Sequence, residues 1–297
     1  MSAGELLQHL VNGASLGSLY ALLAIGYSMV YGILRLINFA HGDIFMIGAY
    51  AAYYGALIFH LPWFIAFPAA LLLTGIIGVI IDLGGYRPLR NAPRISALIS
   101  AIGISFFLEN LCIVLFTGRP KAFPRPDIFG AILTIGEVRI LSVNLFIPAI
   151  TGAALLILVL LIYKTRIGLG MRAVSYDIET ARLMGINVNR TISLTFVTGS
   201  ILAAIGGIMW GLKYPQLQPL MGVFPGLKAF IAAILGGIGS IGGATLGGFL
   251  LGMAEILIVA FLPALAGYRD AFAFLILIAI LLVRPSGILG VELGEKA

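Results

Sequence analysis

The chain has 297 residues, of which 61% are hydrophobic and 10% are charged, and its net charge is +6. Soluble domains carry about 25% charged residues, and a soluble fold of this length could not hide so much apolar surface, because surface-to-volume scaling leaves too much of it outside. The composition therefore excludes a water-soluble domain and predicts an integral membrane protein, in which an excess of basic residues reflects loop bias rather than nucleic-acid binding.

Nine apolar stretches are candidates for membrane-spanning helices, which need about 20 residues to cross a bilayer. They are residues 6–33, 44–59, 64–81, 96–116, 142–163, 191–212, 229–239, 244–261 and 271–283. Their apolar runs are continuous, whereas the strands of a transmembrane barrel alternate apolar and polar residues. The sequence therefore predicts an all-α, polytopic transmembrane protein with eight or nine spans in a single domain, residues 1–297.

Two of these stretches are irregular. The first is too long for one straight span, and Gly13, Gly17 and Gly26 are places for it to break or tilt. The stretch 229–239 is short and ends in a glycine-rich run, so we expect it to be half-inserted. Glycine pairs elsewhere in the second half leave two interpretations open, namely tight helix packing and a broken helix or moving gate.

Basic residues are divided unevenly between the two sides of the predicted membrane. The connections 34–43, 82–95 and 164–190 and the tail from Arg284 hold 11 of the 18 Lys and Arg residues, and the other connections hold 7. Because cytoplasmic loops carry the basic excess, the first set is predicted to be cytoplasmic. With nine spans, the amino terminus then lies outside and the carboxy terminus inside.

Two long connections have features of their own. Residues 117–141 contain Pro120, Pro124 and Pro126, which oppose helix, and predict an external loop with a short hairpin at 131–140. Residues 164–190 predict a cytoplasmic amphipathic helix over 176–184, with Ser175 as its N-cap and Gly185 as its terminating residue. Its acids, Asp177 and Glu179, fall in the first turn, and its apolar side holds Ala181, Leu183, Met184 and Ile186.

Polar residues within the spans are candidates for a translocation path, because they are costly in lipid. They are Asn12, Ser15 and Ser18 in the first span; Ser96, Ser100, Ser105, Glu109 and Asn110 in the fourth; Thr195, Thr198 and Ser200 in the sixth; and Glu255 in the eighth. The alternative for Glu109 and Glu255 is an ion pair or hydrogen bond with a neighbouring helix. Ser and Thr are also ordinary helix-packing residues.

The segment Asn38-Phe39-Ala40-His41-Gly42-Asp43 places a histidine and an aspartate two residues apart. A metal site or proton relay is one interpretation, and capping of the next helix is the favoured one. The chain has no G-x-x-x-x-G-K-[ST] phosphate loop, no H-E-x-x-H and no G-x-S-x-G, so ATP hydrolysis, metalloprotease and esterase activities have no support in it. An intramembrane enzyme using Glu109, His41 or Asp43 and a stand-alone passive channel remain as alternatives from other classes.

Several motifs together resemble the LivH-type permeases of bacterial branched-chain amino acid ABC importers. They are the opening Asn12-Gly13-x-Ser15-x-Gly17-Ser18-Leu19-Tyr20-Ala21-Leu22, the segment Leu36-Ile37-Asn38-Phe39-Ala40-His41-Gly42-Asp43, the run Ala181-Arg182-Leu183-Met184-Gly185-Ile186-Asn187 and the closing Arg284-Pro285-x-Gly287-Ile288-Leu289-Gly290. The resemblance covers essentially the whole chain. Residues 179–185 also resemble the ABC coupling motif E-A-A-x-x-x-G, with Thr180 in place of the first alanine.

The resemblance implies a non-enzymatic transport subunit in a bacterial inner membrane. It would pair with a second, related permease, two cytoplasmic ATPases that hold the ATP and Mg²⁺, and a periplasmic or lipoprotein substrate-binding protein. The residues expected to couple to the ATPases are Asp177, Glu179, Ala181, Arg182, Leu183, Met184 and Gly185; an ordinary interfacial helix is the alternative. Leucine, isoleucine and valine are the expected substrates, and urea, short amides or other amino acids are the alternatives. No cofactor or metal is expected in this chain.

Overall fold

The computed structural model describes residues 3–135 and 138–290, and it is almost entirely helical. The long helices are Ala3–Leu34 (α1), His41–Leu57 (α2), Trp63–Ile81 (α3), Arg94–Phe116 (α4), Val143–Lys164 (α6), Val188–Lys213 (α9), Val223–Gly236 (α10), Ile241–Phe261 (α11) and Arg269–Val283 (α12). Three shorter helices are Asp127–Gly130 (α5), Arg166–Tyr176 (α7) and Ile178–Leu183 (α8). A π-helical turn, Asp82–Tyr86, and two 3₁₀ turns, Arg87–Leu89 and Pro263–Tyr268, complete the helical elements.

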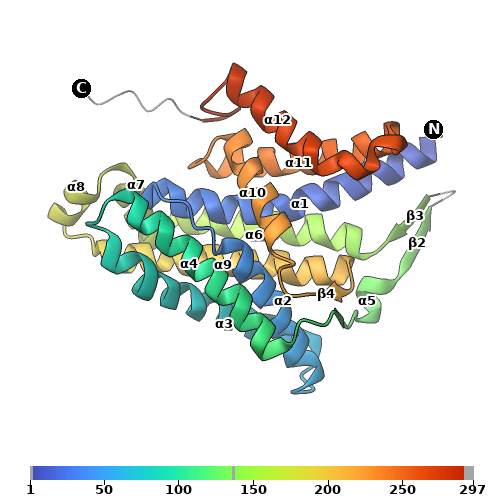
Figure 1. The fold of residues 1–297 in the computed structure, drawn as a ribbon, viewed down its shortest axis with the longest axis horizontal. Coiled ribbons are helices and arrows are strands. Elements are labelled where there is room, and N and C mark those ends of the chain that lie inside the picture. Colours follow the sequence, from blue (N-terminus) through green and yellow to red (C-terminus); the bar gives the residue numbers. More distant parts are fainter. Residues whose placement is uncertain (1–2, 136–137, 291–297) are drawn as a thin grey trace.

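The helices match the predicted membrane spans. Within the described residues, seven helical segments are long and apolar enough to cross a bilayer, and the other two of the nine predicted stretches form the shorter helices α2 and α10. Figure 1 shows α1, α6, α9 and α11 running along the long axis, with α7 and α8 at one end and the amino terminus near the opposite end. Helices α3, α4 and α12 cover the outside with large exposed apolar side chains, as lipid contact requires.

The first helix is the centre of the bundle and is not broken. It continues through Gly13, Gly17 and Gly26, contrary to the predicted break, because these glycines admit close neighbours instead. A Cβ on Gly17 would lie 2.8 Å from the Phe249 backbone of α11, and a Cβ on Gly252 would lie 2.3 Å from the Gly17 nitrogen. The same contact bears out tight packing for one member of the glycine pairs, because a Cβ on Gly248 of α11 would lie 2.4 Å from the Ala21 nitrogen of α1.

Helix α2 begins inside the protein. The non-helical segment 35–40 turns back from the end of α1, and α2 then starts at His41, buried on nearly every side. Ala40 holds the N-cap position and makes no side-chain capping bond. His41 therefore does not cap this helix as predicted, whereas Asp43 lies in its first turn and its carboxylate accepts a hydrogen bond from its own backbone N–H.

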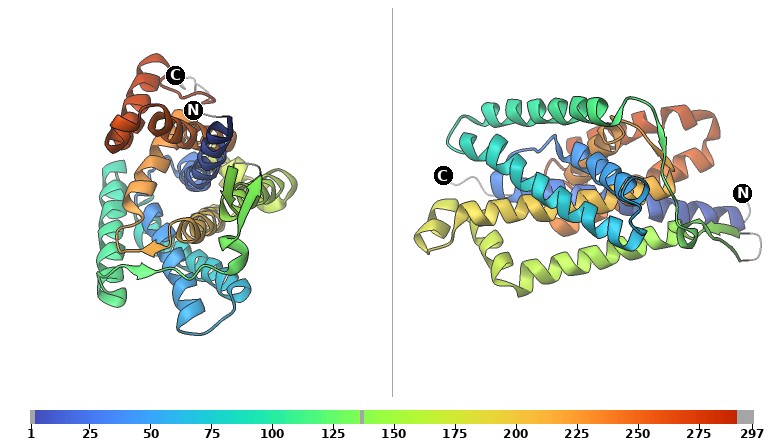
Figure 2. Two further views of the ribbon diagram at one scale, coloured as in Figure 1. Left: turned by 90° about the vertical axis from the view of Figure 1, so that its right-hand side faces the viewer. Right: turned by 90° about the horizontal axis from the view of Figure 1, so that it is seen from below.

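The two long connections lie at opposite ends of the molecule (Figure 1). The first contains the predicted hairpin, in which Ile132–Ile135 (β2) pairs antiparallel with Val138–Leu141 (β3). Its strand Lys121–Ala122 (β1) also pairs with Gln216–Leu217 (β4), in the connection before α10. The right-hand view of Figure 2 shows α7 and α8 at the other end of the molecule, projecting beyond the long helices.

Candidate functional site

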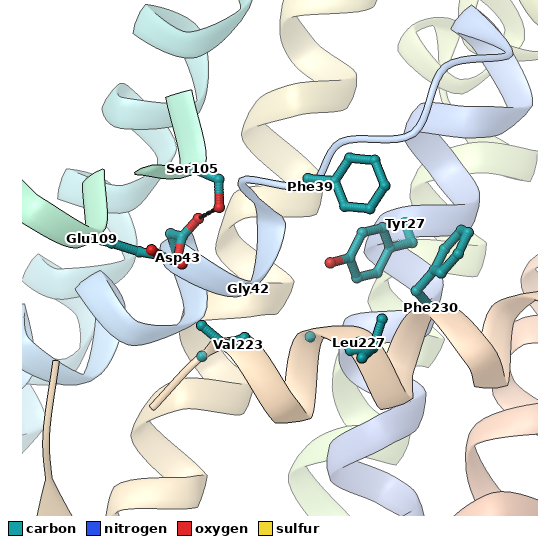
Figure 3. A pocket seen from close by; sticks show the side chains of 11 residues that line it. Tyr27, Phe39, Gly42, Asp43, Ser105, Glu109, Val223, Leu227 and Phe230 are labelled. Atoms are coloured by element: carbon teal, nitrogen blue, oxygen red, sulfur yellow. Dashed lines mark hydrogen bonds between the residues drawn. The ribbon is translucent and has the colours of Figure 1, made fainter. Parts of the chain in front are cut away.

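A cavity of about 140 Å³ lies between α1, α2, α4 and α10. Its polar side is made by Tyr27, Asp43, Ser105 and Glu109, and its apolar side by Phe39, Val223, Leu227 and Phe230 (Figure 3). Gly42, Gly222 and Gly226 complete the wall. We call this space the α2–α4–α10 cavity.

Two carboxylates from different helices meet on the polar side. The Ser105 hydroxyl donates a hydrogen bond of 2.6 Å to Oδ2 of Asp43. Glu109 lies one turn further along α4, on the same face as Ser105, and Figure 3 shows its carboxylate close to that of Asp43. In the described part of the chain neither acid forms an ion pair. The cavity is therefore rich in negative charge with no internal cation.

Glycines bring α2 and α10 together beside these acids. A Cβ on Gly222 would lie 1.9 Å from the Gly42 carbonyl oxygen, and a Cβ on Gly226 would lie 3.0 Å from the Gly42 Cα. Backbone therefore contacts backbone at the first turns of both helices. This contact sets how far the apolar side chains of α10 stand from Asp43.

Glu255 belongs to a different site, made by α1, α10, α11 and α12. Its Oε1 lies 2.8 Å from Nζ of Lys228, and its Oε2 accepts a 2.9 Å hydrogen bond from the Tyr20 hydroxyl. Lys228 also pairs with Asp270 at 2.7 Å, and Arg269 lies 3.5 Å from Glu255. We call this group the Lys228–Glu255 network. For Glu255 the structure has the ion pair that was the alternative to a path residue.

Lys228 is a residue that sequence reasoning missed. Its side chain is only 7% exposed, although its position before an apolar run indicated an external connection. No local pattern links it to an acid 27 residues away.

The remaining polar candidates bond to backbone or to other helices. Ser18, Asn110, Thr195 and Thr198 donate to carbonyl oxygens of their own helices, and Ser100 donates to Gly85 in the turn before α4. Asn12 and Ser15 form a cluster with Asn144 of α6, and Lys213 of α9 donates to Ser15 at 2.8 Å. Of the candidate path residues, only Ser105 and Glu109 line the α2–α4–α10 cavity. Ser96 and Ser200 lie outside it.

The motif around residue 41 is a packing and positioning element. Asn38 accepts a hydrogen bond of 3.1 Å from Tyr86, and the His41 ring meets the Tyr27 ring edge-on at 4.7 Å between centroids. Gly42 supplies the backbone contact with α10, and Asp43 faces the cavity. In the described ranges no three His, Cys, Asp or Glu side chains are grouped as a metal site would require.

The connection 164–190 forms two helices in place of the single predicted one. Ser175 lies inside α7 and bonds to the Arg172 carbonyl, so its predicted N-cap role is wrong. Asp177 is the N-cap of α8 and accepts a 2.6 Å bond from the Thr180 nitrogen. Gly185, with φ of +82°, ends the helix as predicted.

The side chains of α8 divide between two faces. Ala181 is buried against the rest of the chain, whereas Leu183 and Met184 are 86% and 78% exposed. Glu179 and Arg182 are also exposed. The end of the molecule therefore presents apolar side chains bordered by charges.

A third buried acid, Asp82, which sequence reasoning missed, connects this end to α3 and to the turn before α4. Asp82, fully buried after α3, accepts a hydrogen bond of 2.6 Å from Ser193 of α9 and forms an ion pair with Arg90. Arg90 in turn donates to Asn189, two residues after the N-cap of α9. We call this group the Asp82–Arg90 link.

Comparison with known proteins identifies relatives along the whole chain. The family described as "Branched-chain amino acid transport system / permease component" matches residues 9–281. The high-affinity branched-chain amino acid transport system permease protein BraD of Pseudomonas aeruginosa is 44% identical, covering 98% of this chain and 97% of that protein. LivH of Escherichia coli strain K12, a permease protein with the same description, is 42% identical over the same shares. The probable branched-chain amino acid permease LivH of Methanocaldococcus jannaschii is 30% identical, covering 93% and 90%.

Proposed function

This chain belongs to the permease components of branched-chain amino acid transport systems, and from that premise we propose that it carries leucine, isoleucine and valine across a bacterial inner membrane. It is a multi-pass membrane permease of an ABC importer and not an enzyme. The proposal adds the partners: a second, related permease, two cytoplasmic ATPases that bind ATP and Mg²⁺, and a periplasmic or lipoprotein binding protein. Membrane lipid surrounds the spans, and no nucleic acid takes part.

The exposed apolar face of α8 is the observation that supports coupling to ATPases. Leu183 and Met184 are exposed at an end of the molecule where α7 and α8 project beyond the spans. Apolar side chains bordered by charge on a short, capped helix suit the cleft of a partner protein. The caps at Asp177 and Gly185 hold this helix in shape without support from the membrane.

The Asp82–Arg90 link could transmit a displacement of α8 to the membrane-spanning helices. Helix α8 is followed within a few residues by Asn187, which caps α9 through the Arg190 nitrogen. Displacement of α8 would therefore move the start of α9, and Ser193 and Asn189 would transmit it to Asp82 and Arg90. Helix α4 begins four residues after Arg90 and carries Ser105 and Glu109. Alternating access follows when ATP binding and release favour different positions of these helices.

The translocation path would run past the α2–α4–α10 cavity. Among the candidates Asn12, Ser15, Ser18, Ser100, Ser105, Glu109, Asn110, Thr198 and Glu255, we retain Ser105 and Glu109 as path residues and add Asp43. The others have hydrogen-bond partners in the protein: Ser18, Asn110 and Thr198 bond within their own helices, and Asn12, Ser15, Ser100 and Glu255 bond to other elements. A path residue needs a polar atom that is free for the substrate, which favours the cavity acids.

Substitution in α8 tests the coupling proposal. Glu179→Lys and Gly185→Trp should abolish leucine uptake while the subunit still reaches the membrane, because one reverses a charge on the docking helix and the other puts a bulky side chain at a positive φ. Asp127→Lys is the matched control, since Asp127 is an exposed acid at the opposite end. Uptake, membrane content and co-purification of the ATPases would be measured together. Normal uptake in both α8 variants would overturn the coupling assignment.

A further inference from the structure

An apolar amino acid is costly to move through a membrane, because it combines two charged groups with an apolar side chain. At neutral pH its ammonium and carboxylate are both charged, and each loses its hydration in a low-dielectric passage unless protein groups replace the water. Its side chain needs the opposite, an apolar surface. A path for such a molecule therefore requires anionic and apolar groups within one molecular length.

The polar side of the α2–α4–α10 cavity holds two acidic groups that have no cation beside them among the described residues. Asp43 is 2% exposed, and Glu109 faces it from α4 (Figure 3). Two neighbouring carboxylates repel each other, and the repulsion is relieved by a cation between them. Elsewhere in the spans the chain provides that cation itself, as Lys228 does for Glu255. Here the described residues provide none.

Tyr27 adds a hydrogen-bonding group to the polar side. Its side chain is 4% exposed, and its hydroxyl points into the cavity on the side of Asp43. The hydroxyl oxygen accepts a hydrogen bond from the backbone N–H of Gly42. A tyrosine hydroxyl both accepts and donates, so its proton can go to an acceptor atom on a bound molecule.

The opposite side of the cavity supplies the apolar surface that the substrate's side chain requires. Phe39 and Phe230 stand with their ring centroids 6.2 Å apart, and Leu227 lies one turn before Phe230 on α10. These side chains offer an aliphatic group an apolar surface directly across from the acids.

We infer that the α2–α4–α10 cavity is a transient binding site for the zwitterionic head of an apolar amino acid, with Asp43 and Glu109 receiving its ammonium group. Ser105 positions Asp43, the Tyr27 hydroxyl donates to the substrate's carboxylate, and Phe39, Leu227 and Phe230 contact its side chain. This inference rests on the proposed function. It adds that the permease itself recognises the amino group, in addition to any selection by a binding protein.

Measuring uptake by the reconstituted importer tests whether the charges of Asp43 and Glu109, and not only the shapes of their side chains, are needed for transport. Asp43→Asn and Glu109→Gln keep the size of each side chain but remove its charge, and each should lower leucine uptake about tenfold, the effect of one charge-assisted hydrogen bond. Glu109→Asp keeps the charge and should retain more uptake than Glu109→Gln. Asp127→Asn, at an exposed acid outside the cavity, is the control. ATPase activity stimulated by leucine-loaded binding protein should persist in all of them. Wild-type uptake in both neutral variants would overturn the site.

Thiol labelling tests the cavity even if the importer does not couple. Cys112 is the chain's one cysteine, so Ser105→Cys in a Cys112→Ser background places a unique thiol beside Asp43. Relative to a free thiol in solution, a cationic methanethiosulfonate should label it about tenfold faster than an anionic one, because the acids attract cations. Adding Asp43→Asn and Glu109→Gln should remove this preference. Leucine should slow labelling, and 4-methylpentanoate, which lacks the ammonium, should not. Equal rates for the two reagents, or equal protection by the two compounds, would overturn the inference.

If the wild-type importer shows no ATP-dependent leucine uptake while the labelling results are as expected, the proposed function fails and the cation-selective cavity stands. If uptake is normal and labelling shows no charge preference, the importer stands and the cavity assignment fails.

Discussion

Two acidic sites within the described spans, at Glu255 and at Asp43, differ in whether a cation of the chain lies beside the acid. Glu255 is 4% exposed and has Lys228, Arg269 and the Tyr20 hydroxyl around it, so its charge is balanced by neighbours from three other helices. Asp43 is just as buried, but in the described part of the chain its carboxylate is bonded to the Ser105 hydroxyl and its own backbone N–H and to no cation, and it faces another acid, Glu109.

This difference separates a structural charge from one available to a ligand. A buried ion pair is costly to break, because removal of one partner leaves the other charge uncompensated. The Lys228–Glu255 network therefore holds α10, α11 and α12 to α1. An acid that lacks a cation contributes no such link, and its retention in a span is better explained by a mobile cation that binds and leaves.

The largest expected effect comes from Lys228→Met. The substitution leaves Glu255 buried without its closest cation, and it should lower the free energy of unfolding by about 3 kcal/mol. Thermal unfolding of the detergent-purified chain would measure the loss. Arg269→Met is the matched control, because Arg269 is 57% exposed and more distant from Glu255, so its loss should be much smaller.

Removing both partners sharpens the same comparison. The double variant Lys228→Met, Glu255→Met should be more stable than Lys228→Met alone, since no unpaired charge remains. A double variant that is less stable than either single one would show that the network acts through something other than charge balance.

A smaller effect is expected at the glycine contact beside the cavity. Gly222→Ala places a Cβ 1.9 Å from the Gly42 carbonyl oxygen, and α2 and α10 must separate. Overpacking of this kind costs about 1–3 kcal/mol, and the uptake defect should exceed the stability defect because the cavity walls move apart. Gly103→Ala is the control, since no atom lies within 4 Å of a Cβ there. Equal behaviour of the two variants would show that the contact is not tight.

The smallest effect on stability is expected at the unpaired acids. Glu109→Gln removes a like-charge repulsion with Asp43, so the unfolding free energy should stay the same or rise by less than about 1 kcal/mol, in contrast to Lys228→Met. The same thermal measurement applies. Destabilisation by several kcal/mol would indicate that Glu109 has a structural partner, and the contrast between the two sites would fail.

The sequence by itself determined the class of the protein and its local elements. Continuous apolar runs predicted the nine long helices, because in lipid a helix satisfies its own backbone hydrogen bonds. Eight or nine spans were expected, and seven helical segments of the described chain are long and apolar enough to cross a bilayer. The prolines of residues 117–141 predicted a non-helical connection, and the hairpin expected at 131–140 is present as paired strands 132–135 and 138–141. Gly185 predicted the end of α8, because a residue with positive φ ends a helix locally. The α8 N-cap is Asp177 and not Ser175, because a second helix that was not predicted, α7, runs to Tyr176.

Only the tertiary structure decided which polar residues meet. Tyr20 and Glu255 are 235 residues apart, and Asp43 and Ser105 are 62 apart, so no local spacing predicts either contact. Glu109 and Glu255 were indistinguishable as acids within apolar runs, and α1 was expected to break at glycines that instead admit α11 and His41. The physical reason is the same in each case. The sequence of a span indicates that a residue lies within the membrane, whereas the residue's charge partner and close contacts depend on which helix packs beside it.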